Sequence, residues 1–157
     1  MTIRVITISD RASAGVYEDR SGPAITEVLA AAYPDAILET DLVSDDEEAV
    51  RAALLRGLDA ADWVITTGGT GVTPRDRAPE ATRSVIDREI PGVAEALRSA
   101  AASQTPFAAL SRGIAGMRGN RFVVNLPGSP RGARQGAEVL APLLAHALAM
   151  VRGEPHA

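Results

Sequence analysis

The chain has 157 residues, of which 46% are hydrophobic and 23% charged, with a net charge of −4 and no cysteine. This composition is typical of a globular domain long enough to bury a core, and it excludes disulfides, zinc–thiolate sites and a cysteine nucleophile. The negative charge argues against nucleic-acid binding, and neither a membrane span nor a secretory signal is apparent, so we expect one cytoplasmic domain over residues 1–157.

The absence of lysine excludes two further kinds of site. All sixteen Lys and Arg positions are arginine. A P-loop nucleotide site and a lysine Schiff base both need lysine, so the sequence excludes both. Positive charge for binding phosphate groups must therefore come from arginine or from a metal ion.

Three predicted strands lie in the first half of the chain, at residues 3–9, 36–43 and 62–66, and the second of these reads as an edge strand. Predicted helices separate them, and a β–α–β–α–β order implies parallel strands with right-handed crossovers. The carboxyl ends of parallel strands meet at one rim, where open α/β sheets bind their ligands. We therefore expect one rim to gather the loops at residues 9–21, 44–46 and 67–76.

The starts of the two helices are predicted from capping residues. Ser21 is expected to cap the first helix, which Tyr33 ends. Ser44 and Glu47 form a predicted capping box for the second helix. Its inward face is predicted at Val50, Ala53, Leu54 and Leu58.

The third strand runs into a loop rich in glycine and threonine, Thr66-Thr67-Gly68-Gly69-Thr70-Gly71, which continues to Asp76. Glycine lets backbone N–H groups approach a ligand closely, and successive amides form a concavity suited to a phosphate. Asp76 adds a hard oxygen ligand of the kind that Mg²⁺ prefers when it also binds substrate phosphates. The stretch predicts a site for a phosphorylated ligand and a metal; a plain tight turn is the alternative.

The second half of the chain contains two further helices, a hairpin and a long final helix. We expect helices at residues 79–87 and 93–103, a hairpin of 113–117 with 121–125, a second glycine loop at 125–130, and a helix from about 133 to 151.

Five segments together resemble the MogA/MoaB family of molybdenum-cofactor biosynthesis, which includes the G domains of plant and animal molybdenum-insertion proteins. The resemblance covers nearly the whole chain in order. The segments are residues 8–15, 19–23, 66–80, 105–112 and 125–130.

The resemblance implies a three-layer α/β/α fold with a mostly parallel sheet and a small antiparallel hairpin, assembled as a homotrimer. It implies a molybdopterin adenylyltransferase that uses ATP and Mg²⁺ and releases pyrophosphate, with a molybdenum-insertion protein as a further partner. Asp45 and Asp76 match the family's catalytic aspartates, and Ser111 matches a serine that contacts the pterin phosphate. Ala78 stands where many relatives carry threonine, and Ala101 where the plant domain has a serine; neither departure touches the aspartate pair.

The resulting site prediction assigns catalysis and metal binding to Asp45 and Asp76, with Asp46 as an alternative to Asp45. Arg75 and Arg112 are candidates for neutralising phosphate charge. The expected nucleotide-binding residues are Ser9, Asp10 and Gly71. The expected substrate-binding residues are Thr67, Gly68, Gly69, Thr70, Ser111, Asn125, Pro127, Gly128 and Ser129.

Two other functions are open at this stage. The first alternative is a family member that binds molybdopterin without turnover. The second is an assembly protein that functions through the surface of its trimer. The presence of both Asp45 and Asp76 favours the enzyme.

Overall fold

The computed structural model describes residues 1–154, so the last three residues of the predicted domain lie outside the described part. One sheet of six strands runs through the molecule, in the order β2-β1-β3-β6-β5-β4. Four neighbouring strands are parallel, and β5 and β4 form an antiparallel extension at one edge. The bounds are β1 (Thr2–Ile8), β2 (Ile37–Val43), β3 (Trp63–Thr67), β4 (Arg88–Glu89), β5 (Ala115–Arg118) and β6 (Arg121–Leu126).

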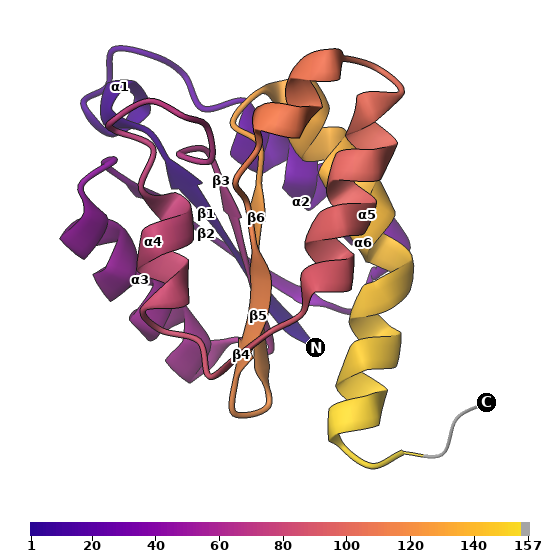
Figure 1. Cartoon of the computed structure of the whole chain (residues 1–157). Coiled ribbons are helices and arrows are strands. Elements are labelled where there is room, and N and C mark those ends of the chain that lie inside the picture. Colours follow the sequence, from indigo (N-terminus) through magenta and orange to yellow (C-terminus); the bar gives the residue numbers. More distant parts are fainter. Residues whose placement is uncertain (155–157) are drawn as a thin grey trace.

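Helices cover both faces of the sheet and complete the predicted three layers (Figure 1). One face carries α2 (Ser21–Ala32), α5 (Pro91–Ala102) and α6 (Pro130–Val151), and the other carries α3 (Glu47–Ala60) and α4 (Ala78–Arg83). Two short helical turns, α1 (Asp10–Ser13) and η1 (Pro106–Leu110), lie in loops. Among the helices of residues 1–154, none combines the length and the hydrophobicity that a membrane span requires.

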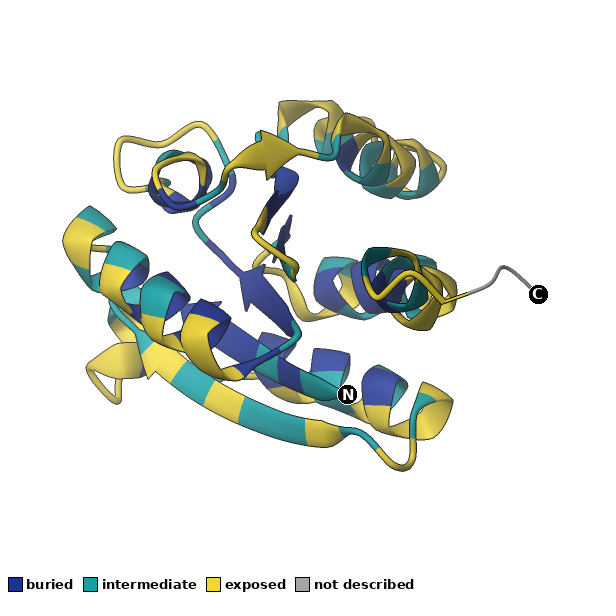
Figure 2. Ribbon diagram, turned by 90° about the horizontal axis from the view of Figure 1, so that it is seen from below, coloured by how far each residue is buried: buried dark blue, intermediate teal, exposed yellow. Residues whose placement is uncertain are grey.

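The core is divided in two by the sheet, as the alternation of strand side chains requires. On β1, Ile3 and Val5 pack with α2 and α6, whereas Ile6 and Ile8 pack with α3. The predicted inward face of α3 is confirmed, because all four of its residues are buried. Figure 2 shows buried central strands, and β2 at the edge is at most partly buried, as predicted.

Both predicted helix caps are wrong. Ser21 is the first helical residue of α2, and the carboxylate of Asp19 accepts the N–H groups of Ser21 and Gly22 at 3.0 and 3.1 Å. Helix α3 begins at Glu47 and is capped by Asp46, which accepts the N–H of Ala49 at 2.9 Å. A carboxylate is the stronger acceptor for an N–H group, and in both cases a nearby aspartate makes the capping hydrogen bond expected from serine.

Besides η1, two short elements were not predicted. The polar loop at residues 9–21 contains α1, whose first turn is capped by the Ser9 hydroxyl at 3.1 Å from the N–H of Ala12. Strand β4 has two residues, which is too short for an alternating pattern to appear in the sequence. Neither element changes the predicted order of the main strands and helices.

Candidate functional site

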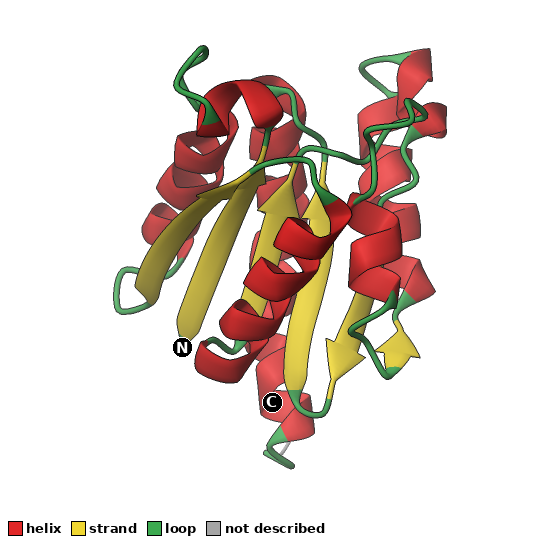
Figure 3. Cartoon of the chain, turned by 90° about the vertical axis from the view of Figure 1, so that its left-hand side faces the viewer, coloured by secondary structure: helices red, strands yellow, loops and turns green. Residues whose placement is uncertain are grey.

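The three loops at the carboxyl ends of β1, β2 and β3 meet at one rim, as the sequence predicts, at the upper edge of the sheet in Figure 3. Two reciprocal hydrogen bonds join the first two loops. The N–H of Asp10 donates to Oδ2 of Asp45 at 2.8 Å, and the N–H of Asp45 donates to Oδ1 of Asp10 at 3.0 Å. Arg75 of the third loop binds Asp10 through Nε and Nη2 at 3.0 and 2.7 Å. Residues far apart in the chain are thereby fixed together.

The carboxylates of this rim influence one another's ionisation. Partial burial is the main reason that the pKa of Asp45 lies above its ordinary value, and the negative charges of Asp10 and Asp76 raise it further. The hydrogen bond from the N–H of Asp10 and the positive charge of Arg75 lower this pKa, but by less. The pKa of Asp10 lies below its ordinary value because it accepts the N–H of Asp45 and binds Arg75. The charge of Asp76 therefore contributes to the electrostatic environment of Asp45.

The glycine loop passes between the two aspartates. A Cβ on Gly69 would lie 3.5 Å from Oδ1 of Asp45, and a Cβ on Gly71 would lie 2.9 Å from Oδ2 of Asp76. Gly68 has φ +97°, and a Cβ there would lie 2.2 Å from the carbonyl oxygen of Ile8. Only glycine fits this path, which keeps backbone amides within reach of a ligand.

The second glycine loop, residues 127–129, packs directly against the first. A Cβ on Gly128 would lie 3.1 Å from the Cα of Gly68. The Thr67 hydroxyl donates to the carbonyl oxygen of Pro127 at 2.7 Å. The two loops therefore form one wall at the rim.

This wall separates two hollows. The first, the polar hollow, has a volume of about 230 Å³ and is lined by Ser9, Asp45, Gly68, Gly69 and Gly128, among others. The second, the large cleft, has a volume of about 310 Å³ and is lined by Thr70, Gly71, Phe107, Ser111, Pro127 and Ser129, among others. Most of the predicted binding residues therefore line one hollow or the other, and the glycine loop borders both.

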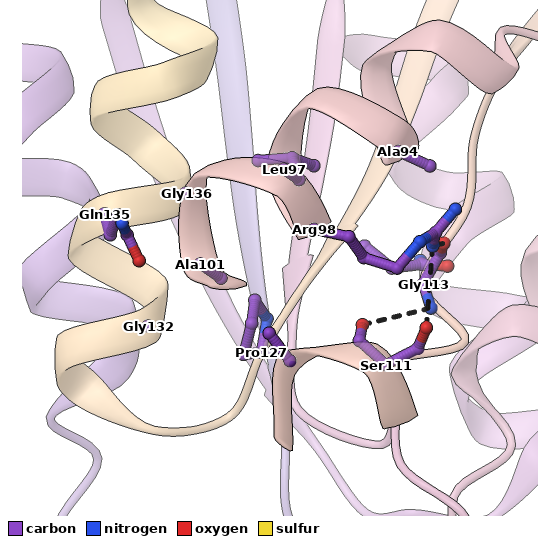
Figure 4. Close-up of a pocket in the computed structure, with 12 residues that line it drawn as sticks. Ala94, Leu97, Arg98, Ala101, Ser111, Gly113, Pro127, Gly132, Gln135 and Gly136 are labelled. Atoms are coloured by element: carbon purple, nitrogen blue, oxygen red, sulfur yellow. Dashed lines mark hydrogen bonds between the residues drawn. The ribbon is translucent and has the colours of Figure 1, made fainter. Parts of the chain in front are cut away.

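The large cleft continues into a small cavity of about 40 Å³ between α5, α6 and the loop that carries Ser111 (Figure 4). Arg98 extends from α5 toward this loop and donates to the carbonyl oxygen of Gly113 at 2.9 Å. Gln135 of α6 also lines the cavity and donates to the carbonyl oxygen of Ala100 at 3.0 Å. Neither residue was predicted, because each is a single polar residue in a helix, without a motif around it.

Asp76 is held in place by its own loop and by Arg112. Its Oδ2 accepts the N–H and the hydroxyl of Thr73 at 2.9 and 2.7 Å. Arg112 donates to the carbonyl oxygens of Gly71 and Asp76 at 2.7 and 2.5 Å and forms an ion pair with Glu80. Binding to Arg112 is the main reason that the pKa of Glu80 lies below its ordinary value. Arg112 thus holds the glycine loop in place, and each nitrogen of its guanidinium already has a partner within the protein.

Two other predicted side chains form hydrogen bonds within the protein. The buried side chain of Asn125 donates to the hydroxyls of Thr66 and Thr82 at 3.0 and 2.8 Å and accepts the N–H of Ile114 at 3.2 Å. Asn125 therefore supports the floor beneath the loops. The hydroxyl of Ser129 caps α6 by accepting the N–H of Gly132 at 3.2 Å.

The two aspartates offer oxygen atoms suited to Mg²⁺. Each uses Oδ2 within the protein, whereas its Oδ1 forms no hydrogen bond with any residue from 1 to 154. In the same range, no group of three or more His, Asp or Glu side chains is placed to hold a metal ion. Mg²⁺ is commonly held by one or two carboxylates, with water and substrate phosphates as the remaining ligands, so this donor pair fits it.

Known proteins resemble the chain over nearly its whole length. A family described as "Probable molybdopterin binding domain" matches residues 4–146. The molybdopterin adenylyltransferase of Helicobacter pylori J99 is 38% identical over 154 residues, covering 96% of this chain and 88% of that protein. The Escherichia coli K12 protein of the same name is 39% identical over 141 residues, covering 88% and 72%. The crystal structure of the molybdopterin biosynthesis enzyme MoaB from Thermus thermophilus aligns with a TM-score of 0.89 and 44% identity, covering 98% of both chains.

Proposed function

The chain belongs to the MogA/MoaB family of molybdenum-cofactor biosynthesis, and from this premise we propose that it is a molybdopterin adenylyltransferase. As a nucleotidyltransferase, it would transfer AMP from ATP to the terminal phosphate of molybdopterin and release pyrophosphate. The observation that carries the proposal is the position of Asp45 and Asp76 on either side of one glycine loop that borders two hollows. Such an arrangement suits a reaction between two phosphorylated substrates.

The two hollows differ in the chemistry of their walls. The large cleft, with Phe107 and Leu110 beside Ser111, suits the flat pterin ring system with its phosphate near the serine. The polar hollow, with Ser9, Asp45 and the amides of Gly68 and Gly69, suits the phosphates of ATP. The volume of the large cleft is at the lower end of the range of about 300–1,000 Å³ for small-molecule pockets.

The reaction places few demands on acid–base chemistry. A phosphate oxygen of molybdopterin attacks the α-phosphorus of ATP, and the bond from that phosphorus to the oxygen bridging to the β-phosphate breaks. The nucleophile is already an anion, so no strong general base is needed. The barrier comes from bringing negative charges together, which positioning and backbone N–H groups lower.

Asp45 and Asp76 would hold Mg²⁺ through the Oδ1 atoms that the protein leaves uncommitted. When bound, the ion would neutralise charge on the transferring phosphates. Arg75 has a different role in this account, because its pairing with Asp10 sets the distance between the first and third loops.

The test is transfer of radiolabelled AMP from ATP to molybdopterin by the purified chain in the presence of Mg²⁺. We expect a labelled adenylyl-molybdopterin and one pyrophosphate for each AMP transferred. Molybdopterin binding without any adenylate would instead show a non-catalytic binding protein. Loss of partner recruitment on mutating the surface, with the site intact, would favour an assembly protein.

The homotrimer, the cytoplasmic location and a molybdenum-insertion protein as partner stay predictions. Light scattering of the purified chain tests the first, and a mass of one or two chains would contradict it.

A further inference from the structure

A third hollow, which we call the outer groove, adjoins both proposed binding sites. It has a volume of about 560 Å³, and six of the residues that line it are charged: Glu18, Asp19, Arg20, Glu27, Arg131 and Arg134. It shares Arg20 with the polar hollow and Arg131 with the large cleft. The outer groove thus adjoins the place where the proposed reaction would cleave the bond between the α- and β-phosphates of ATP.

Most arginines of the chain already have partners. At the rim, Arg75 binds Asp10 and Arg112 binds Glu80, so the two arginines suggested by the sequence are engaged within the protein. Among residues 1–154, the arginines whose side chains form no hydrogen bond, ion pair or ring contact are Arg20, Arg51 and Arg131. Two of these three line the outer groove, and both are at least partly exposed.

Two of the three acidic residues of the groove have partners within the protein. Asp19 turns inward, where it accepts the hydroxyl of Thr7 at 2.6 Å and the N–H groups at the start of α2. Glu27 forms an ion pair with Arg134 at 2.5 Å. Glu18 is the one acidic residue of the groove whose side chain has no partner within the described residues, whereas two arginines of the groove, Arg20 and Arg131, have none. The uncommitted side chains of the groove therefore carry net positive charge.

The leaving group of the proposed reaction needs positive charge. When the α-phosphorus is attacked, the breaking bond leaves its electron pair on an oxygen of pyrophosphate, which departs as a polyanion. The rim around it carries the carboxylates of Asp45 and Asp76, which no arginine pairs within the described residues and whose negative charges repel it. A guanidinium group presents a fork of donors matched to phosphate oxygens.

We propose that Arg20 and Arg131 bind the β- and γ-phosphates of ATP and then the departing pyrophosphate, an inference that rests on the proposed function. The outer groove is then the exit for the leaving group. The nucleotide would lie with its α-phosphate beside the glycine loop and its outer phosphates between these two arginines.

The experiment is calorimetric titration of the intact chain with inorganic pyrophosphate and Mg²⁺, comparing wild type with Arg20→Gln, Arg131→Gln and Arg51→Gln. The third variant is a matched control, because Arg51 is equally uncommitted but lines neither the groove nor the two sites. Each groove variant should raise the Kd roughly tenfold, the usual effect of losing a charge-assisted hydrogen bond. Arg51→Gln should leave it unchanged, and thermal unfolding should show that all three variants are folded.

Wild-type binding by both groove variants would overturn the inference. So would an equal loss in Arg51→Gln, since that would show an effect of net charge alone. AMP transfer by the wild-type protein is measured separately. If pyrophosphate binding depends on both arginines and no AMP is transferred, the anion site is supported and the proposed function is wrong.

Discussion

The path of the glycine loop can be tested by adding a single methyl group at Gly68. Its φ of +97° is strained for any residue with a side chain, and a Cβ there would lie 2.2 Å from the carbonyl oxygen of Ile8. That oxygen belongs to β1, which is fixed between two neighbouring strands, so it has little freedom to move. Gly68→Ala therefore combines backbone strain with overlap.

The two contributions can be estimated separately. Positive-φ strain is about 1–2 kcal/mol for a residue with a Cβ, and overlap in a packed region adds about 1–3 kcal/mol. The free energy of unfolding should fall by about 3–4 kcal/mol, which corresponds to a Tm lower by roughly 10 °C for a chain of this length.

Two other glycines serve as controls in urea and thermal unfolding. Gly15 has φ +72° and no atom within 4 Å of an added Cβ, so Gly15→Ala should show the strain alone, about 1–2 kcal/mol. Gly92 has neither positive φ nor a neighbour within 4 Å, and it lies in α5, so Gly92→Ala should leave stability unchanged or slightly raised. Equal losses for Gly68→Ala and Gly15→Ala would refute the close approach of the loop to β1.

Three further variants test the contacts of the site by unfolding measurements. Arg112→Gln should lower the free energy of unfolding by about 2 kcal/mol, allowing for the partial exposure of its ion pair. The pairing lowers the pKa of Glu80, so the stability that the ion pair contributes is present above pH 4.5 and is lost as the pH falls through the pKa of Glu80 in the folded state. The stability difference between wild type and Arg112→Gln should therefore shrink at low pH, and a difference independent of pH would contradict this. Asp45→Asn should not lower the Tm at pH 7, because burial and neighbouring charges raise the pKa of Asp45 and its ionised form therefore destabilises the fold; a clear decrease would be inconsistent. Asp19→Ala should cost about 1–2 kcal/mol through loss of the α2 cap, whereas the exposed Asp35→Ala should cost nothing measurable, and equal effects would count against the cap.

Much of the fold could be predicted because periodicity depends on local spacing. Apolar runs and helical stripes identified the main strands and helices, and the rule for parallel sheets placed three loops at one rim. Helix caps were harder to predict, since several short polar residues near each helix start compete for the same N–H groups. In the structure Asp46 and Asp19 accept these N–H groups, and the loop conformation that places them there cannot be read from the sequence.

The sequence predicted which residues lie at the candidate site better than it predicted where their side chains point. The sequence places Asn125 beside a glycine loop, and only the structure shows that its side chain points inward to two threonines. Arg112 lies 41 residues from Gly71 along the chain, so their contact follows from tertiary packing rather than from a motif. The uncommitted state of Arg20 and Arg131 is likewise visible only once the partners of the other arginines are known.

We propose that Asp76 acts on the charge that develops during AMP transfer, more than on binding of molybdopterin. The most direct measurement compares kcat for AMP transfer and the Kd for molybdopterin in wild type, Asp76→Asn and the exposed control Asp59→Asn. Asparagine keeps an acceptor for the Thr73 donors and removes the negative charge. We predict a loss in kcat of roughly a hundredfold or more with little change in Kd, and no effect of Asp59→Asn. Equal losses in kcat and in binding, or full turnover by Asp76→Asn, would contradict the account.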